Sequence, residues 1–238
     1  MEGSELSQTM QNPSVFSQVP SPRESQSLVH FRAVFHSLAV VAEYGEPAAE
    51  GHVTRVSAYT SFLAAHVLGE SPREAERVGV AALLHDIGKV AVPKELLLRP
   101  SGLSLEERFF VQQHVMWGYD LIERLERYFS PLNMDEALFQ TAKDVAHFHH
   151  ENWDGSGYSH GLQGEAIPMA ARLVKLADVI DALLSPRPYK AAWPWERVRA
   201  ELVRLAGAHF DPALVQGLLT QEDAFRKVVQ TAMGEMRG

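Results

Sequence analysis

Apolar residues recur at helical spacing from about residue 28 onward. Two successive segments carry them three or four positions apart, which places them on one face of a helix. The positions are Leu28, Phe31, Phe35 and Leu38 in the first segment, and Val56, Tyr59 and Leu63 in the second. We find no segment with the sustained apolar and polar alternation of a strand, so the pattern predicts amphipathic helices.

Capping residues indicate where further helices begin. Ser71 and Ser104 each precede a glutamate by three positions, as in a capping box, and Pro72 suits the first helical position. We expect the helix that opens at Ser104 to continue to about Tyr128. Further starts are expected at Asn133 and Glu136, Pro168 (to about Leu184), Pro194 (to near Gly207), Asp211-Pro212 and Thr220.

These elements predict one all-α domain over residues 29–238, with eight or nine helices and one long loop at residues 151–167. Loops of that length inside a compact domain usually have a function. Residues 1–28 differ in composition from the rest of the chain, because Ser, Gln and Pro make up half of them. Such a segment buries too little apolar surface to offset its ordering, which predicts a flexible tail.

The charge balance argues against several classes of partner. The chain has 22 Lys and Arg against 30 Asp and Glu, a net charge of −8, whereas binding to DNA or to an anionic membrane calls for a basic surface. Apolar runs fall short of the roughly 20 residues that span a bilayer, and the first residues do not resemble a signal peptide. We therefore expect a cytoplasmic protein.

Histidine carries the candidate chemistry. The sequence has eleven His and no Cys, so a bound metal would need imidazole and carboxylate ligands. The adjacent pairs His85-Asp86 and His149-His150 are poor arrangements for core packing, but each projects two ligands from one helix end. His36 and His66 are single residues on helix faces, and we assign them to ordinary packing.

These pairs belong to longer runs that resemble a known family. The run His85-Asp86-Ile87-Gly88-Lys89 is similar to the signature of the HD superfamily. The run from His149 to Tyr158, which reads HHENWDGSGY, is similar to the signature of HD-GYP domains, bacterial cyclic di-GMP phosphodiesterases. The resemblance continues through other motifs over about residues 29–220, and it implies an all-α HD helical bundle.

The resemblance implies a centre with two divalent metal ions, bridged by Asp86. The first ion would be held by His52, His85, Asp86 and Asp178, and the second by His114, His149, His150 and Asp86. Imidazoles combined with carboxylates suit borderline to hard metals, so iron or manganese is expected, with Zn, Co, Ni and Mg open.

The implied reaction is hydrolysis of cyclic di-GMP to linear pGpG, with GMP left open as a further product and a hydroxide shared by the two metals as nucleophile. Lys89 and Asp86 are the catalytic residues, because Lys89 is placed to bind the scissile phosphate. The substrate-binding residues would be Arg187, Lys190, Tyr158 and Gly157.

Two departures from the family pattern change the expectations. Ser159 replaces the proline of the GYP triplet, which removes a fixed backbone angle and puts partner docking through this loop in doubt. Ala48 stands where relatives with three metals have a glutamate, and Glu46 and Glu50 are out of helical phase with His52. A dinuclear centre is therefore expected.

Partners and alternatives remain open at this point. Regulation is expected from a diguanylate cyclase (GGDEF) protein or another separate protein, and we keep a homodimer open. One alternative is an HD phosphohydrolase for a different cyclic dinucleotide or nucleotide. Another is a module that senses cyclic di-GMP or docks on a protein without turnover.

Overall fold

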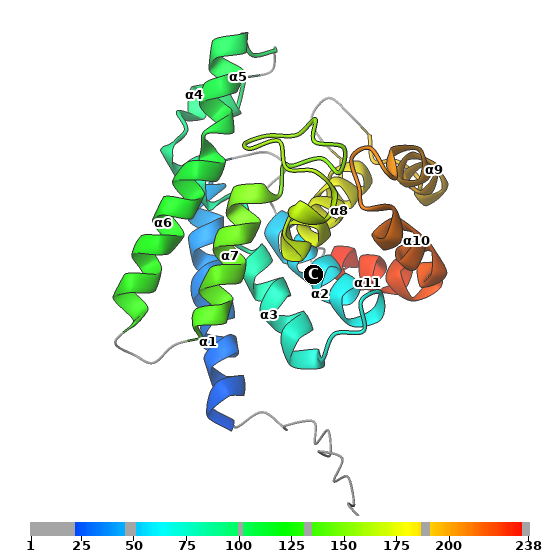
Figure 1. Cartoon of the computed structure of the whole chain (residues 1–238), viewed down its shortest axis with the longest axis horizontal. Coiled ribbons are helices and arrows are strands. Elements are labelled where there is room, and N and C mark those ends of the chain that lie inside the picture. Colours follow the sequence, from blue (N-terminus) through cyan, green and yellow to red (C-terminus); the bar gives the residue numbers. More distant parts are fainter. Residues whose placement is uncertain (1–21, 46–50, 100–101, 131–134, 187–190, 235–238) are drawn as a thin grey trace, which may run out of the picture.

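The computed structural model describes residues 22–45, 51–99, 102–130, 135–186 and 191–234. Within these ranges the chain is helical, and an isolated β-bridge joins Ala206 and Phe210 (Figure 1). The α-helices are α1 (Pro22–Ala42), α2 (His52–His66), α3 (Pro72–Ala82), α4 (Lys94–Leu97), α5 (Leu105–Gln112), α6 (His114–Phe129), α7 (Glu136–Phe148), α8 (Met169–Leu184), α9 (Trp195–Leu205), α10 (Pro212–Thr220) and α11 (Glu222–Gly234). Two 3-10 helices, η1 (Ile87–Ala91) and η3 (Gly164–Ala166), complete them, which confirms the all-α prediction.

Two hydrophobic clusters hold the bundle together. One joins α1, α3, α6 and α7, and in it the rings of Phe31 and Phe139 meet edge to face with centroids 5.3 Å apart. The other joins α2 and α8 with α9, α10 and α11, and Tyr59 meets Phe225 there at 5.3 Å. Helices α3 and α7 contribute to both clusters, so they form the middle of the molecule (Figure 1).

Helices begin at most of the predicted positions, and capping residues are found there. Ser71 accepts a hydrogen bond from the backbone N–H of Glu74, and Ser104 forms a complete capping box with Glu107. Asp211 caps α10, and α8 begins directly after Pro168 as expected. At the start of α7 the capping residue is Asp135, whose side chain accepts from the N–H of Leu138.

Three helix boundaries differ from the prediction. The last helix, α11, begins at Glu222, because the expected start at Thr220 is the final residue of α10. Helix α1 begins at Pro22, ahead of the expected start near residue 28, and residues 1–21 of the predicted tail lie outside the described residues. The helix expected from Ser104 to Tyr128 is two helices, because the chain breaks at Gln113. At the break the imidazole of His114 donates to the Val111 carbonyl at 2.7 Å, which satisfies a group that the helix end leaves free.

In the described part of the chain, no helix is both long and apolar enough to cross a membrane.

Candidate metal centre

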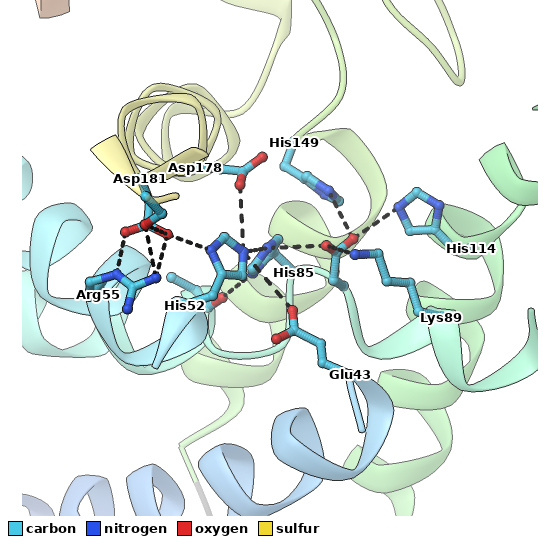
Figure 2. Close-up of polar contacts among 12 residues, drawn as sticks. Glu43, His52, Arg55, His85, Lys89, His114, His149, Asp178 and Asp181 are labelled. Atoms are coloured by element: carbon cyan, nitrogen blue, oxygen red, sulfur yellow. Dashed lines mark hydrogen bonds and ion pairs between the residues drawn. The ribbon is translucent and has the colours of Figure 1, made fainter. Parts of the chain in front are cut away.

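Two sets of ligand atoms meet where several helices begin or end, and Asp86 belongs to both (Figure 2). Within each set, one ligand atom of every residue lies within 4.8 Å of the others. The first set is Asp86, His114, His149 and His150, and the second is Glu43, His52, His85 and Asp86. Because helix ends are held by the two hydrophobic clusters, these ligands are positioned by rigid elements.

The two oxygens of Asp86 face different neighbours. Its Oδ1 lies 3.1 Å from Nε2 of His114 and 3.6 Å from Nε2 of His149. Its Oδ2 lies 3.4 Å from Nε2 of His85 and 2.8 Å from the ammonium of Lys89. One carboxylate therefore serves both sets, as a bridging ligand would.

Hydrogen bonds on the far side of three rings fix their orientation. The Nδ1 atoms of His85, His114 and His149 donate to the backbone carbonyls of residues 82, 111 and 145, at 2.9, 2.7 and 3.0 Å. These bonds hold a ring proton on Nδ1 and direct Nε2 at the centre, where it can act as a ligand once it carries no proton.

The centre also leaves buried acceptors without donors. Oδ1 of Asp86 and the Nε2 atoms of His114 and His149 are buried and form no hydrogen bond with a described group. Lone pairs that face one another in a buried space need a cation between them. The donor set and its geometry therefore fit a divalent metal.

His52 is held from behind by a buried ion pair. Its Nδ1 lies 2.8 Å from Oδ2 of Asp181, and Arg55 donates to both oxygens of that carboxylate. Ser185 accepts from the same guanidinium at 3.1 Å. On the other side of the ring, Nε2 lies 3.6 Å from Oδ1 of Asp178. Asp181 therefore orients the ring of His52, whereas Asp178 lies beside the ring nitrogen that points into the centre.

A family model described as an HD domain matches residues 37–214. The chain belongs to the HD domain family. It is 40% identical over 194 residues to the 3'3'-cGAMP-specific phosphodiesterase 2 of Vibrio cholerae. The aligned region covers 82% of this chain and 35% of that protein. It is 40% identical over 188 residues to the cyclic di-GMP phosphodiesterase response regulator RpfG of Xanthomonas campestris. Here the aligned region covers 79% of this chain and 47% of that protein. The chain thus covers less than half the length of either relative.

A solved structure shares the fold of this HD domain. Bd1817, an HDG"Y"P protein from Bdellovibrio bacteriovorus, superposes with a TM-score of 0.53 at 18% identity. The match covers 82% of this chain and 64% of that one. The predicted relation to HD-GYP proteins is confirmed by these relatives and by this fold.

Burial and charge divide the HD centre into two electrostatic halves. Burial raises the pKa of Asp86, but Lys89 and His85 outweigh that effect and hold the pKa well below its usual range. Burial lowers the pKa of His149 and His150, which keeps both rings neutral. At His85 the charge of Asp86 overcomes burial and raises the pKa to about 9. His85 would therefore have to lose a proton to act as a metal ligand, whereas His149 and His150 are already neutral.

Two glycines allow backbone segments of the HD domain to approach closely. A Cβ on Gly88 would lie 1.9 Å from the carbonyl oxygen of His114, so Gly88 lets η1 lie against the start of α6. A Cβ on Gly157 would lie 2.3 Å from the backbone nitrogen of Asn152. The structure thus explains Gly157 by loop packing, and its predicted contact with substrate stays a prediction.

The long loop is pinned beside the centre by buried groups. Glu151 accepts from the N–H groups of His160 and Gly161 through Oε1, at 2.6 and 3.2 Å. The Tyr158 ring stacks on His150, with centroids 4.6 Å apart, whereas Ser159 is exposed. Tyr158 therefore covers the ring of His150, a member of the first set.

Arg172, on α8, fastens the end of the same loop. It donates to the Ile167 carbonyl at 2.9 Å and pairs with Asp211 at 2.7 Å. Its guanidinium also lies over the ring of Trp153, 5.6 Å from the centroid. The loop is thereby tied to α8 and α10.

The structure brings together every predicted ligand except Asp178 in one of the two sets, and Asp178 lies beside His52. Arg187 and Lys190 lie outside the described residues. Sequence reasoning missed Glu43, which follows α1 and belongs to no motif. It also missed the role of Arg55, for which a signal existed: an arginine on the apolar face of α2, three positions after His52.

Proposed function

We propose that this HD domain hydrolyses cyclic di-GMP to linear pGpG, with GMP open as a further product. The observation that carries the proposal is the position of Asp86 between two ligand sets rich in imidazole. A pair of metals about 3.5–4 Å apart suits hydrolysis of a phosphodiester. Relatives at 40% identity are named as phosphodiesterases of cyclic dinucleotides, which supports this substrate class.

The ligands we assign follow the two halves of the centre. His52, His85, Asp86 and Asp178 would hold one ion, and His114, His149, His150 and Asp86 the other. Bound there, divalent ions would lower the pKa of a water molecule toward neutrality and offset the charge of the phosphodiester. Iron or manganese fits the mixed imidazole and carboxylate set best, with Zn, Co, Ni and Mg as weaker candidates.

Lys89 is the cation that we assign to the reacting phosphate. Its ammonium lies 2.8 Å from Oδ2 of Asp86, on a half-buried side chain. A phosphate oxygen at the shared carboxylate would come within its reach, and its fixed charge would stabilise negative charge that develops in the transition state. Asp86 would keep Lys89 protonated and oriented.

Further substrate contacts follow from the loop and from the resemblance. Tyr158 and Gly157 lie at the edge of the centre, where Tyr158 offers its ring and hydroxyl to a nucleotide. Arg187 and Lys190 combine a bidentate guanidinium with a point charge, a suitable pair for the second phosphodiester.

Hydrolysis of 3'3'-cGAMP is a second candidate, supported by the relative from Vibrio cholerae at 40% identity. Both substrates present the same phosphodiester to the centre, so the chemistry would be shared. Regulation by a GGDEF protein or another separate protein, and assembly into a homodimer, remain predictions.

Product analysis tests the function. The protein is purified anaerobically, loaded with Fe²⁺ or Mn²⁺, and its metal content is measured before incubation with each cyclic dinucleotide. We expect linear dinucleotide or GMP from the wild type and from His66→Gln, a control outside the centre, and no product from Asp86→Ala. Wild type with two bound metals that converts neither substrate would refute the phosphodiesterase and favour the sensing module.

A further inference from the structure

Glu43 directs a buried carboxylate into the metal centre from outside the HD motifs. It follows the last residue of α1, and its residue is only 3% exposed. Its Oε1 lies 4.0 Å from Nε2 of His52. Figure 2 shows that it approaches His52 from the side opposite to Asp178.

This carboxylate lacks the partners that burial requires. Oε1 of Glu43 is buried and forms no hydrogen bond with a described group, and its contact with His52 is at the outer limit of an ion pair. A buried carboxylate in that condition is unfavourable unless a cation compensates it. Its oxygen lies within 4.8 Å of ligand atoms of His52, His85 and Asp86, which is the spacing around one metal ion.

We propose that Glu43 is a direct ligand of the ion held by His52 and His85. Ala48 occupies the position four residues before His52, so the carboxylate comes from the end of α1 instead of from the segment before α2. The inference rests on the metal centre of the proposed function.

The added ligand makes the two ions chemically different. The ion at His52 and His85 faces the carboxylates of Glu43, Asp86 and Asp178, whereas the other set has three imidazoles and Asp86 alone. Carboxylates favour Mn²⁺ and Mg²⁺, and imidazoles favour Zn²⁺ and Fe²⁺. The Glu43 side is therefore the harder site, with the stronger preference for Mn²⁺.

Metal binding and thermal stability together test this assignment. The variant Glu43→Gln keeps the shape of the side chain and removes its charge, and Glu76→Gln serves as a control at a partly exposed glutamate on α3, outside the centre. Mn²⁺ content after dialysis, chelator competition and thermal unfolding are measured for each protein with and without Mn²⁺.

We expect Glu43→Gln to lose at least 10- to 100-fold in Mn²⁺ affinity at one of two sites, while the second equivalent stays bound. Without metal the variant should unfold at the same temperature as wild type or higher, because a buried unpaired charge is gone. Its gain in Tm on adding Mn²⁺ should be smaller than that of wild type and of Glu76→Gln.

Unchanged Mn²⁺ affinity at both sites, with an unchanged gain in Tm, would overturn the assignment. If Glu43→Gln fails to fold, the variant Glu43→Asp tests the assignment instead. It keeps the carboxylate, but its side chain is one methylene shorter, so it should weaken Mn²⁺ binding at the same single site. Wild type that binds no metal would refute the centre itself. If wild type binds two metals and Glu43→Gln binds them with the same affinity, only the role of Glu43 is refuted.

Discussion

Replacing Asp181 by alanine is expected to weaken metal binding and to destabilise the fold at the same time. Asp181 is 1% exposed and Arg55 is 3% exposed, so the variant leaves a guanidinium buried without its counter-charge. Breaking a buried pair from one side costs about 3–5 kcal/mol. For a protein of this size, that lowers Tm by roughly 6–20 °C.

The effect on metal follows from the contact with His52. Asp181 accepts the proton on Nδ1 of His52 at 2.8 Å, and without it the ring loses its fixed orientation and part of its basicity. Loss of such a supporting contact typically lowers metal affinity by about 10- to 100-fold. Urea denaturation of the metal-free protein and chelator competition measure the two effects separately.

Arg55→Met provides the matched comparison. It should destabilise the fold by a similar amount, because Asp181 is then buried without its arginine, but it should weaken metal binding less, because Asp181 still orients His52. The double variant should be less destabilised than the sum of the two single variants, since neither charge remains. Asp181→Ala within about 1 kcal/mol of wild type, with unchanged metal affinity, would refute the reasoning.

Three further outcomes follow from the centre. Asp86→Ala should lose both metal equivalents in parallel, and elemental analysis that finds two retained equivalents would exclude bridging. Lys89→Ala should keep its metals and lower kcat by about 10²- to 10³-fold in the product assay, as for other electrostatic stabilisers; lost metal would make Lys89 structural instead. Because the pKa of His85 is raised from 6.5 to about 9, its contribution to the stability of the metal-free protein is complete below pH 6.5 and disappears as pH rises through 9. Thermal unfolding from pH 6 to 10 measures this, and a Tm that is flat or rises there would contradict it.

Helix starts were readable from local sequence because a cap depends on a few adjacent residues. Ser71, Ser104 and Asp211 cap the helices that were assigned to them. The early start of α1 had a signal too, since residues 21–24 read SPRE, the same four residues that open α3 at Ser71. The break at Gln113 had no such signal in the sequence, because the apolar pattern continues through it. The break is accompanied by the hydrogen bond from His114 to the Val111 carbonyl.

Sequence reasoning found most residues of the two sets but missed Glu43. Paired ligands at helix ends, such as His85 with Asp86, are visible in sequence because adjacent residues project from one terminus. Glu43 follows no spacing rule relative to His52, since residues 46–50 separate it from α2. It reaches the centre because Phe31 and Phe35 pack α1 into the cluster with α3, α6 and α7.

The order of residues along the chain thus determined that this is a helical protein with a histidine and aspartate centre, because periodicity, caps and adjacent ligands are local properties. Packing between distant helices determined which carboxylates face that centre and which support it. Asp178 and Asp181 lie three positions apart on α8, yet one faces the metal side of His52 and the other holds the back of its ring. Their roles depend on where α2 lies against α8. Packing between residues far apart in the sequence determines that position, whereas the spacing of residues along α8 does not.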